Sequence, residues 1–439
     1  MRIFNRDLHD YSHRFFHETK QSISKLVAVS IPKFPGNKLN RVQRHFNPVP
    51  MSQDSKLPAL IAAKPTAIGR ASSFGESKRF YLPELDTLRF FAFLAVFLRH
   101  SLADANEVTK SWGIPHLISS LITATVEAGM FGVDLFFLLS SFLITSLLLR
   151  EQERCGRIDV KGFWIRRALR IWPLYFVFVA VAGFLLPLFF HFVAPPEPGH
   201  VVGLLTFTQN WAIAFSDAGR GSPTLVLWSV SMEEQFYLIW PVVLLLAGVR
   251  RLRAIAIGMI VFAFFARIVA IYAGASAFML WCATPFRLEP IAVGALIALN
   301  RDRIPNFGNQ TRLGMLCLGA AIPVICMLKW SGSLWINAAI MPLATIACAL
   351  VLLSVIGADF RLFTFKPLIY LGTISYGLYV FHQLAISFSP RLAIPGLPFG
   401  RTISAFLLTV ALAALSYRFL ETPFLRMKDR FAHIQSRPV

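Results

Sequence analysis

The sequence predicts an all-α integral membrane protein, a bundle of about ten transmembrane helices with both termini in the cytoplasm. Of the 439 residues, 56% are hydrophobic and only 15% are charged, and the mean hydropathy is +0.59. The apolar residues gather in blocks of roughly 15 to 23, about the length that crosses a hydrocarbon layer. Lysine and arginine avoid these blocks and collect between them. This is the composition of a membrane bundle, not of a large soluble core.

The chain divides into three parts. Residues 1–80 hold 14 Lys and Arg against 5 Asp and Glu, without a sustained apolar period. We expect a mostly disordered cytoplasmic tail there, with an amphipathic helix on the membrane surface as the alternative for part of it. Residues 81–425 carry the apolar blocks and form the predicted transmembrane domain. Residues 426–439 are predicted to be a short cytoplasmic tail.

Ten apolar segments can be placed in the transmembrane domain. They lie at about 89–103, 128–149, 171–193, 232–248, 254–273, 285–299, 313–328, 335–356, 369–388 and 402–420. The first and sixth are short and carry charge, so they should face protein or a watery cavity. A further stretch, 201–215, is expected to be re-entrant or interfacial.

Charge placement predicts the orientation. With the N-terminal tail in the cytoplasm, the inner segments carry 33 Lys and Arg and the outer loops carry 5. This asymmetry is the positive-inside pattern, so it also explains the net charge of +20 without nucleic acid as a partner. The five cysteines show no CxxC spacing, and no metal site is predicted.

Ionisable residues inside the first two segments are candidate functional groups, because charge within a membrane is costly. Arg89 and His100 are eleven residues apart, which places them on nearly one helix face, roughly 16 Å apart along the axis. The alternative is an interfacial arginine and a satisfied core histidine. Asp134 needs a cationic partner on a neighbouring helix. It could orient a catalytic group or join helices, and we include it among the candidate catalytic residues.

Three arginines precede the third segment at the predicted cytoplasmic surface: Arg166, Arg167 and Arg170. Such a cluster would suit the phosphates of a nucleotide-bearing donor such as coenzyme A. Ordinary positive-inside anchoring, with the neighbouring aromatic residues at the interface, is the competing explanation.

Ser231, Glu233 and Glu234 stand directly before the fourth segment. Ser231 and Glu234 have capping-box spacing, which would make Glu234 structural. Glu233 has no such role, and a carboxylate at the outer mouth of a span could position a hydroxyl acceptor. We therefore expect Glu233 to be catalytic and Ser231 to line the substrate cavity.

Two further groups of polar residues are candidates for the substrate cavity. Arg287 and Glu289 are two residues apart on a helix, so each should pair elsewhere, and salt bridges between helices are favoured over a site role. In the ninth segment Ser375, Tyr379 and His382 share one face. This polar stripe should point into the bundle, where it could line an acceptor cavity or only join helices by hydrogen bonds.

Together these segments resemble the membrane-bound acyltransferase 3 family. The motifs are an Arg, ten residues and a His, then GVDLFF, RRxxRIxPLY, WSxSxEEQFY, R-x-E-x4-G, SYxxYxxH and SYxxxExP, in this order over about residues 81–425. Thr87 and Ser141 depart from the family pattern, in which glycine is usual. Each adds a small polar side chain at an expected close contact.

The resemblance implies an acyl-CoA-dependent O-acyltransferase in a bacterial inner membrane. It implies that His100 is catalytic and Arg89 essential, that the arginine cluster serves the acyl-CoA side, and that Glu233 lies near the acceptor. Acyl-CoA, in particular acetyl-CoA, would be a co-substrate, with no permanently bound cofactor. The acceptor would be a hydroxyl of a surface polysaccharide or similar glycan, and glycan-synthesis proteins are candidate partners.

A function from another class competes with the enzyme. A transporter or flippase of a glycan or lipid would line its pathway with the same intramembrane polar residues. Acyl transfer that depends on His100 favours the enzyme, whereas substrate movement without acyl chemistry favours the transporter.

Overall fold

The computed structural model describes residues 80–102, 113–216, 221–329, 333–358, 360–393 and 399–431. Every regular element in these ranges is helical, which confirms the all-α prediction. The predicted N-terminal tail and the last eight residues lie outside the described residues, so their predictions stay open.

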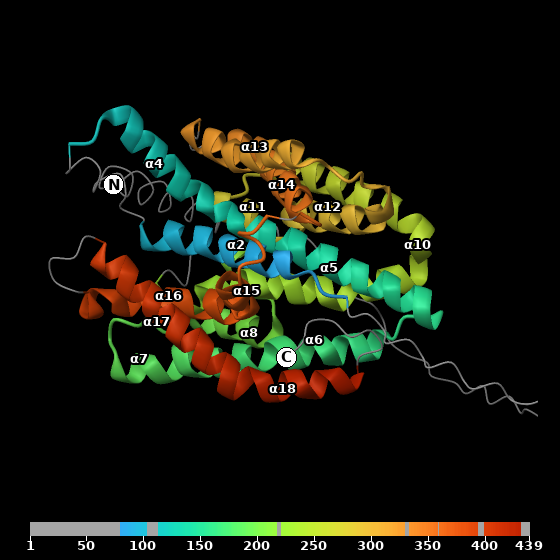
Figure 1. The fold of residues 1–439 in the computed structure, drawn as a ribbon. Helices are drawn as coiled ribbons and strands as arrows, with labels where there is room; N and C mark the ends of the chain where they lie inside the picture. Colours follow the sequence, from blue (N-terminus) through green and yellow to red (C-terminus); the bar gives the residue numbers. More distant parts are fainter. Residues whose placement is uncertain are drawn as a thin grey trace, which may run out of the picture. The chain divides into compact units, whose positions relative to one another are not determined.

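Figure 1 shows the arrangement of the helices. In chain order they are α2 (Pro83–Ser101), α4 (His116–Ala128), α5 (Gly132–Cys155), α6 (Val160–Phe178), α7 (Leu186–Phe189), α8 (Pro198–Thr206), α9 (Gln209–Phe215), α10 (Leu227–Tyr272), α11 (Ala277–Cys282), α12 (Leu288–Leu299), α13 (Asn309–Leu328), α14 (Leu334–Val355), α15 (Lys366–Thr373), α16 (Ser375–Leu392), α17 (Gly400–Ser416) and α18 (Thr422–Lys428). A π-helical stretch, Val179–Leu185, joins α6 to α7.

Six helical stretches in the described residues are long and apolar enough to cross a membrane. They are His116–Cys155, Val160–Phe189, Pro223–Tyr272, Asn309–Leu328, Leu334–Val355 and Gly400–Lys428. The stretches agree with an integral membrane protein, whereas the count of ten spans stays a prediction.

Four of the ten predicted segments are not separate candidate spans, and three of these differences have a clear physical cause. The predicted fourth and fifth segments both lie in α10, which is broken at Gly248, where φ is 67° and ψ is 163°. Only glycine adopts this backbone readily. Helix α2 carries four charged residues, and α12 has 12 residues, about 18 Å of helix. The predicted stretch 201–215 is two short helices, α8 and α9.

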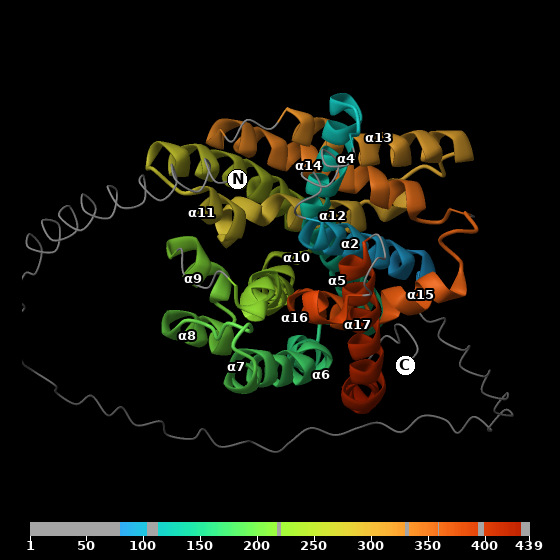
Figure 2. The ribbon, with the colours of Figure 1, turned by 90° about the vertical axis from the view of Figure 1, so that its left-hand side faces the viewer.

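Helix α2 lies at the centre of the packing that positions the candidate residues. It contacts α5, α15 and α16, and Figure 2 shows it between α12, α13 and α14 on one side and α16, α17 and α6 on the other. Glycines permit the close approaches. A Cβ atom on Gly372 would overlap the carbonyl of Asp86, and one on Gly294 would overlap the carbonyl of Leu138. Helices α15 and α12 therefore lie directly against α2 and α5.

Thr87 and Ser141, the two departures from the family pattern, make hydrogen bonds between elements. Thr87 Oγ1 donates to the carbonyl of Phe363 at 3.0 Å, and Ser141 Oγ donates to the carbonyl of Ile291 at 2.5 Å. Both side chains are fully buried. Each added hydroxyl thus has a partner, and helix packing accommodates both residues.

Replacing Gly294 by alanine tests the close contact of α12 with α5. The added methyl group would overlap the Leu138 carbonyl, and overpacking of this kind costs about 1–3 kcal/mol. We expect a lower melting temperature for the detergent-solubilised protein. Gly314→Ala is the matched control, because a Cβ on Gly314 of α13 meets nothing within 4 Å. Equal melting temperatures for the two variants would contradict this account of the packing.

Candidate active site

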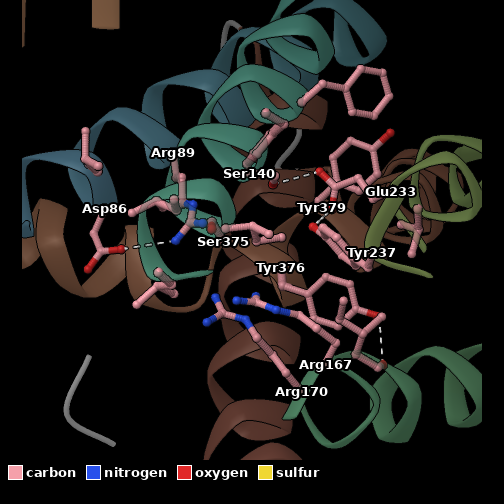
Figure 3. Close-up of a pocket in the computed structure, with 18 of the residues that line it drawn as sticks. Asp86, Arg89, Ser140, Arg167, Arg170, Glu233, Tyr237, Ser375, Tyr376 and Tyr379 are labelled. Atoms are coloured by element: carbon pink, nitrogen blue, oxygen red, sulfur yellow. Dashed lines mark hydrogen bonds and ion pairs between the residues drawn. The ribbon is translucent and has the colours of Figure 1, made fainter. Parts of the chain in front are cut away.

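A cavity of about 1150 Å³, including its open mouth, lies between five helices (Figure 3). Its charged and polar lining is contributed by α2, α5, α6, α10 and α16. The polar lining residues are Tyr81, Asp86, Arg89, Ser140, Arg167, Arg170, Ser229, Glu233, Tyr237, Ser375, Tyr376 and Tyr379. Apolar side chains such as Phe136, Phe137 and Ile144 complete the wall. The cavity can therefore take an elongated ligand with both anionic and apolar parts.

The arginines face one part of this cavity. The side chain of Asp159 caps α6 by accepting from Gly162 N at 2.9 Å. From this start, Arg167 and Arg170 reach the cavity wall one turn apart. Arg167 lies over the rings of Phe163 and Tyr237, with centroids 5.3 and 5.6 Å away. Its Nε is buried without a hydrogen-bond partner, which leaves a donor for a ligand.

Arg166 has a different environment from the other two arginines. It pairs with Glu151 at 3.0 Å and donates to the carbonyl of Phe431 at 2.5 Å. Glu151 also accepts from the backbone N–H of Asp159. Arg166 does not line the cavity and instead joins the end of α5, the start of α6 and the C-terminal segment. The structure thus divides the predicted cluster in two.

Arg89 and Glu233 line the same cavity, although the sequence placed Glu233 at an outer mouth. The Arg89 guanidinium lies 3.5 Å from Asp86, one turn away on α2. Glu233 accepts hydrogen bonds from Ser140 at 3.0 Å and Tyr237 at 2.6 Å. Helix α10 begins at Leu227, so Glu233 stands almost two turns inside it. The carboxylate is therefore held within the cavity wall.

The predicted capping box at Ser231 and Glu234 is wrong, because the helix starts four residues before Ser231. Ser231 is fully buried and donates to the carbonyl of Leu227 at 3.2 Å. Glu234 accepts from the indole of Trp172 at 2.9 Å. Ser231 does not line the cavity.

His100 lies at the opposite end of α2 from Asp86 and Arg89, the charged cavity residues of this helix, and its side chain is exposed. Its Nδ1 is 2.9 Å from Nε2 of His382, which is completely buried. Nδ1 of His382 is in turn 2.5 Å from the carbonyl oxygen of Tyr379. Neither histidine lines the cavity, whereas Tyr379 does, and its hydroxyl lies 2.6 Å from Ser229 Oγ. On α16, Tyr379 lines the cavity and His382, one turn further along, contacts His100. This part of α16 therefore connects the cavity to His100.

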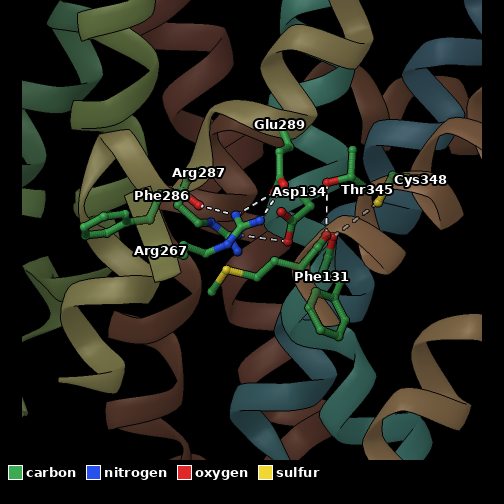
Figure 4. A network of polar contacts seen from close by, with 9 residues as sticks. Phe131, Asp134, Arg267, Phe286, Arg287, Glu289, Thr345 and Cys348 are labelled. Atoms are coloured by element: carbon green, nitrogen blue, oxygen red, sulfur yellow. Dashed lines mark hydrogen bonds and ion pairs between the residues drawn. The ribbon is translucent and has the colours of Figure 1, made fainter. Parts of the chain in front are cut away.

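Asp134, Arg287 and Glu289 form buried ion pairs away from the cavity lining (Figure 4). Arg287 donates to Asp134 at 2.9 Å, and both side chains are 1% exposed. Arg267 makes two hydrogen bonds to Glu289, at 2.5 and 2.6 Å. The predicted pairing between helices is confirmed, and the partner of Asp134 is Arg287 and not Arg89. These contacts join α5, α10 and the start of α12.

Several residues of the site were missed in the sequence. Asp86, Ser140, Tyr237 and Tyr376 all line the cavity. Their signal was weak, since each is a single polar residue in or beside an apolar block. Arg267 was a clearer omission, because an arginine within the fifth apolar segment required a carboxylate partner.

Comparisons with known proteins show what the chain is similar to. Residues 82–418 match the family model described as Acyltransferase domain. The peptidoglycan O-acetyltransferase OatA of Listeria monocytogenes is 29% identical over 79% of this chain and 56% of its own length. The putative peptidoglycan O-acetyltransferase YrhL of Bacillus subtilis is 30% identical over 78% of this chain and 55% of its own. A putative O-acetyltransferase of Staphylococcus aureus is 28% identical, with 78% and 57% covered.

The chain therefore spans a little over half the length of the curated relatives it matches. No solved structure matches it.

Substitution of Asp134 tests the structural role of the buried pair. Asp134→Leu leaves Arg287 buried and unpaired, which costs about 3–5 kcal/mol. We expect a large fall in melting temperature, partly restored in the double variant Asp134→Leu/Arg287→Met, where no charge is left alone. Glu127→Gln is the control, because its ion pair with Arg99 is about one-third exposed and should contribute at most about 1 kcal/mol. If the loss of stability in the double variant equals the sum of the losses in Asp134→Leu and Arg287→Met, the two side chains do not act as a pair.

Proposed function

Because the chain belongs to the acyltransferase 3 family, we propose that it is a membrane O-acyltransferase that transfers an acetyl or other short acyl group from acyl-CoA to a hydroxyl of a carbohydrate. One observation carries the proposal furthest. The first two turns of α2 line an arginine-rich cavity, and an exposed histidine stands at the other end of the helix. A donor and an acceptor could thus approach from opposite ends of one helix.

The cavity has the chemistry of a site for acyl-CoA. Phosphate groups bind well to guanidinium groups, which form charge-assisted and bidentate hydrogen bonds. Arg89, Arg167 and Arg170 supply them, and the polar groups of Glu233 and Tyr237 line the same cavity. The apolar wall suits the chain that connects the nucleotide to the thioester. In this proposal acyl-CoA is a co-substrate, and no cofactor is bound permanently.

The proposed orientation has the cavity mouth on the cytoplasmic side. Tyr81 near the start of α2, Leu147 near the end of α5 and Arg167 near the start of α6 all line this cavity. The basic segment at 150–170 lies at the same end, and such segments favour the cytoplasm. His100 is then on the outer side of a bacterial inner membrane, with about ten spans and both termini inside.

The proposed acceptor is a glycan hydroxyl at the outer side. The names of the relatives from Listeria and Bacillus, both peptidoglycan O-acetyltransferases or putative ones, support peptidoglycan as the first acceptor to test. In the reaction, the hydroxyl oxygen attacks the acyl carbonyl, a C–O bond forms and the C–S bond breaks. The sulfur of coenzyme A takes the electron pair, and His100 accepts the hydroxyl proton.

The lining of the cavity reaches Tyr379 but not His100. Direct transfer therefore requires the region between Tyr379 and His100 to open when the donor binds. The alternative function, a transporter or flippase of a glycan or lipid, would use the same lining without acyl chemistry. Acyl transfer by the purified protein separates the two functions.

Arg167→Gln and Arg170→Gln should each raise the KM for acyl-CoA by about tenfold or more, through the loss of a charge-assisted hydrogen bond. Arg166→Gln is the control, because Arg166 pairs with Glu151 outside the cavity. It should lower the melting temperature and change KM little. Steady-state kinetics with the reconstituted protein measure both effects, and an unchanged KM in the first two variants would remove these arginines from the donor site.

Sealed vesicles test the orientation in the same assay. External acyl-CoA should support transfer in inside-out vesicles and not in right-side-out vesicles. The opposite result would reverse the proposed topology.

His100→Ala should lower kcat by about 10²- to 10⁴-fold, the usual contribution of a general base. A sugar hydroxyl is a weak nucleophile at neutral pH, so transfer gains from an unprotonated imidazole that accepts its proton. His116→Ala changes another exposed histidine, at the start of α4, and should leave kcat unchanged. Full transfer by a folded His100→Ala protein would reject the base and favour the transporter.

A further inference from the structure

We propose that His382 is a positioning residue that fixes the tautomer of His100, so that His100 presents an unprotonated Nε2 at the outer end of α2. The inference rests on the proposed role of His100 as a base and adds a second residue to it. The two histidines are 282 positions apart in the sequence and meet through the packing of α16 against α2.

The carbonyl of Tyr379 determines the proton on His382. A carbonyl oxygen only accepts hydrogen bonds, and it lies 2.5 Å from His382 Nδ1. Nδ1 must therefore carry hydrogen. A neutral imidazole has one N–H, so Nε2 of His382 is unprotonated and can only accept.

The proton on His100 follows from that of His382. Nδ1 of His100 lies 2.9 Å from Nε2 of His382, and the ring planes differ by 10°. Two unprotonated nitrogens at this distance would repel each other. Nδ1 of His100 must therefore be the donor, which leaves Nε2 of a neutral His100 with its lone pair free to accept a proton.

The surroundings of His382 favour its neutral form. The side chain is 0% exposed and contacts the rings of Phe93 and Tyr379, with centroids 6.2 and 5.4 Å away. Within the described part of the chain, no carboxylate forms an ion pair with His382. A buried imidazolium without a counter-charge is costly, so His382 acts as a neutral acceptor in the resting enzyme.

This arrangement also helps after proton transfer. When Nε2 of His100 takes the proton of the attacking hydroxyl, the positive charge on its ring strengthens the hydrogen bond from Nδ1 to His382. His382 thus orients the base and stabilises its charged form, two tasks that a carboxylate performs in the Ser-His-Asp triad. The proton then leaves His100 for solvent.

Two substitutions of His382 separate this role from simple packing. His382→Gln keeps an acceptor near the position of Nε2 and a donor for the Tyr379 carbonyl, so kcat should stay within a few-fold of the parent value. His382→Leu removes both and should lower kcat by about tenfold or more. Gln383→Leu, at the next position of α16, is the matched control with kcat unchanged. Equal kcat values in the Gln and Leu variants of His382 would overturn the inference.

The double variant His100→Ala/His382→Leu tests whether His382 acts through His100. When two residues act as a unit, removing the second causes no further loss of activity once the first is gone. The kcat of the double variant should therefore equal that of His100→Ala. If the two losses multiply, His382 acts independently and the inference fails.

Nitrogen NMR of the full chain with ¹⁵N-labelled histidine tests the tautomer without an activity assay. The His100 signals are identified by their absence in His100→Gln. Nε2 of His100 should appear unprotonated in the parent chain and in His382→Gln, and protonated in His382→Leu. A protonated Nε2 in the parent would overturn the tautomer assignment. An unprotonated Nε2 together with full activity of His100→Ala would support the assignment and reject only the proposed base.

Discussion

The cost of placing charge in a hydrocarbon layer governs how the described helices pack. An ionised side chain is stable there only against an opposite charge or in a polar cavity. This protein uses both solutions on different sides of α5. Asp134 pairs with Arg287 and Glu289 with Arg267, all four nearly or completely buried. On the other side, Ser140 of α5 lines the cavity together with residues of α2, α6, α10 and α16. Three arginines and two carboxylates are among these lining residues.

The two solutions have different consequences for function. In the ion pairs, positive and negative charges are balanced one to one, so helices α5, α10 and α12 are joined without a surplus for a ligand. In the cavity, three arginines stand against two carboxylates, so the arginines outnumber the carboxylates. The surplus of positive charge is what makes the cavity, and not the ion-pair network, the candidate site for an anionic donor.

The sequence predicted the class of fold and most of the polar residues, because both depend on local patterns. Apolar blocks identified the helices, and an intramembrane Asp134 required a cation. Partners could not be predicted in this way, since Arg287 is 153 positions from Asp134 and His382 is 282 positions from His100. Helix starts were also missed: α10 begins at Leu227, within a run whose serines and carboxylates resemble a cap. The pairing of Arg166 with Glu151, which removes it from the arginine cluster, could not be predicted from spacing either.

The contact of Arg166 with the carbonyl of Phe431 has a practical meaning for anything attached to the C-terminal segment. Arg166 directly precedes Arg167, which lines the cavity. The last described turn of the chain is therefore connected to the cavity wall through one residue, Arg166. A domain, tag or reporter that displaces Phe431 would act directly on Arg166 of α6, which Glu151 holds from the other side. The displacement would first affect the proposed donor site, because Arg167 lines it. A protein attached at this end of the chain could thus slow or allow the entry of substrate.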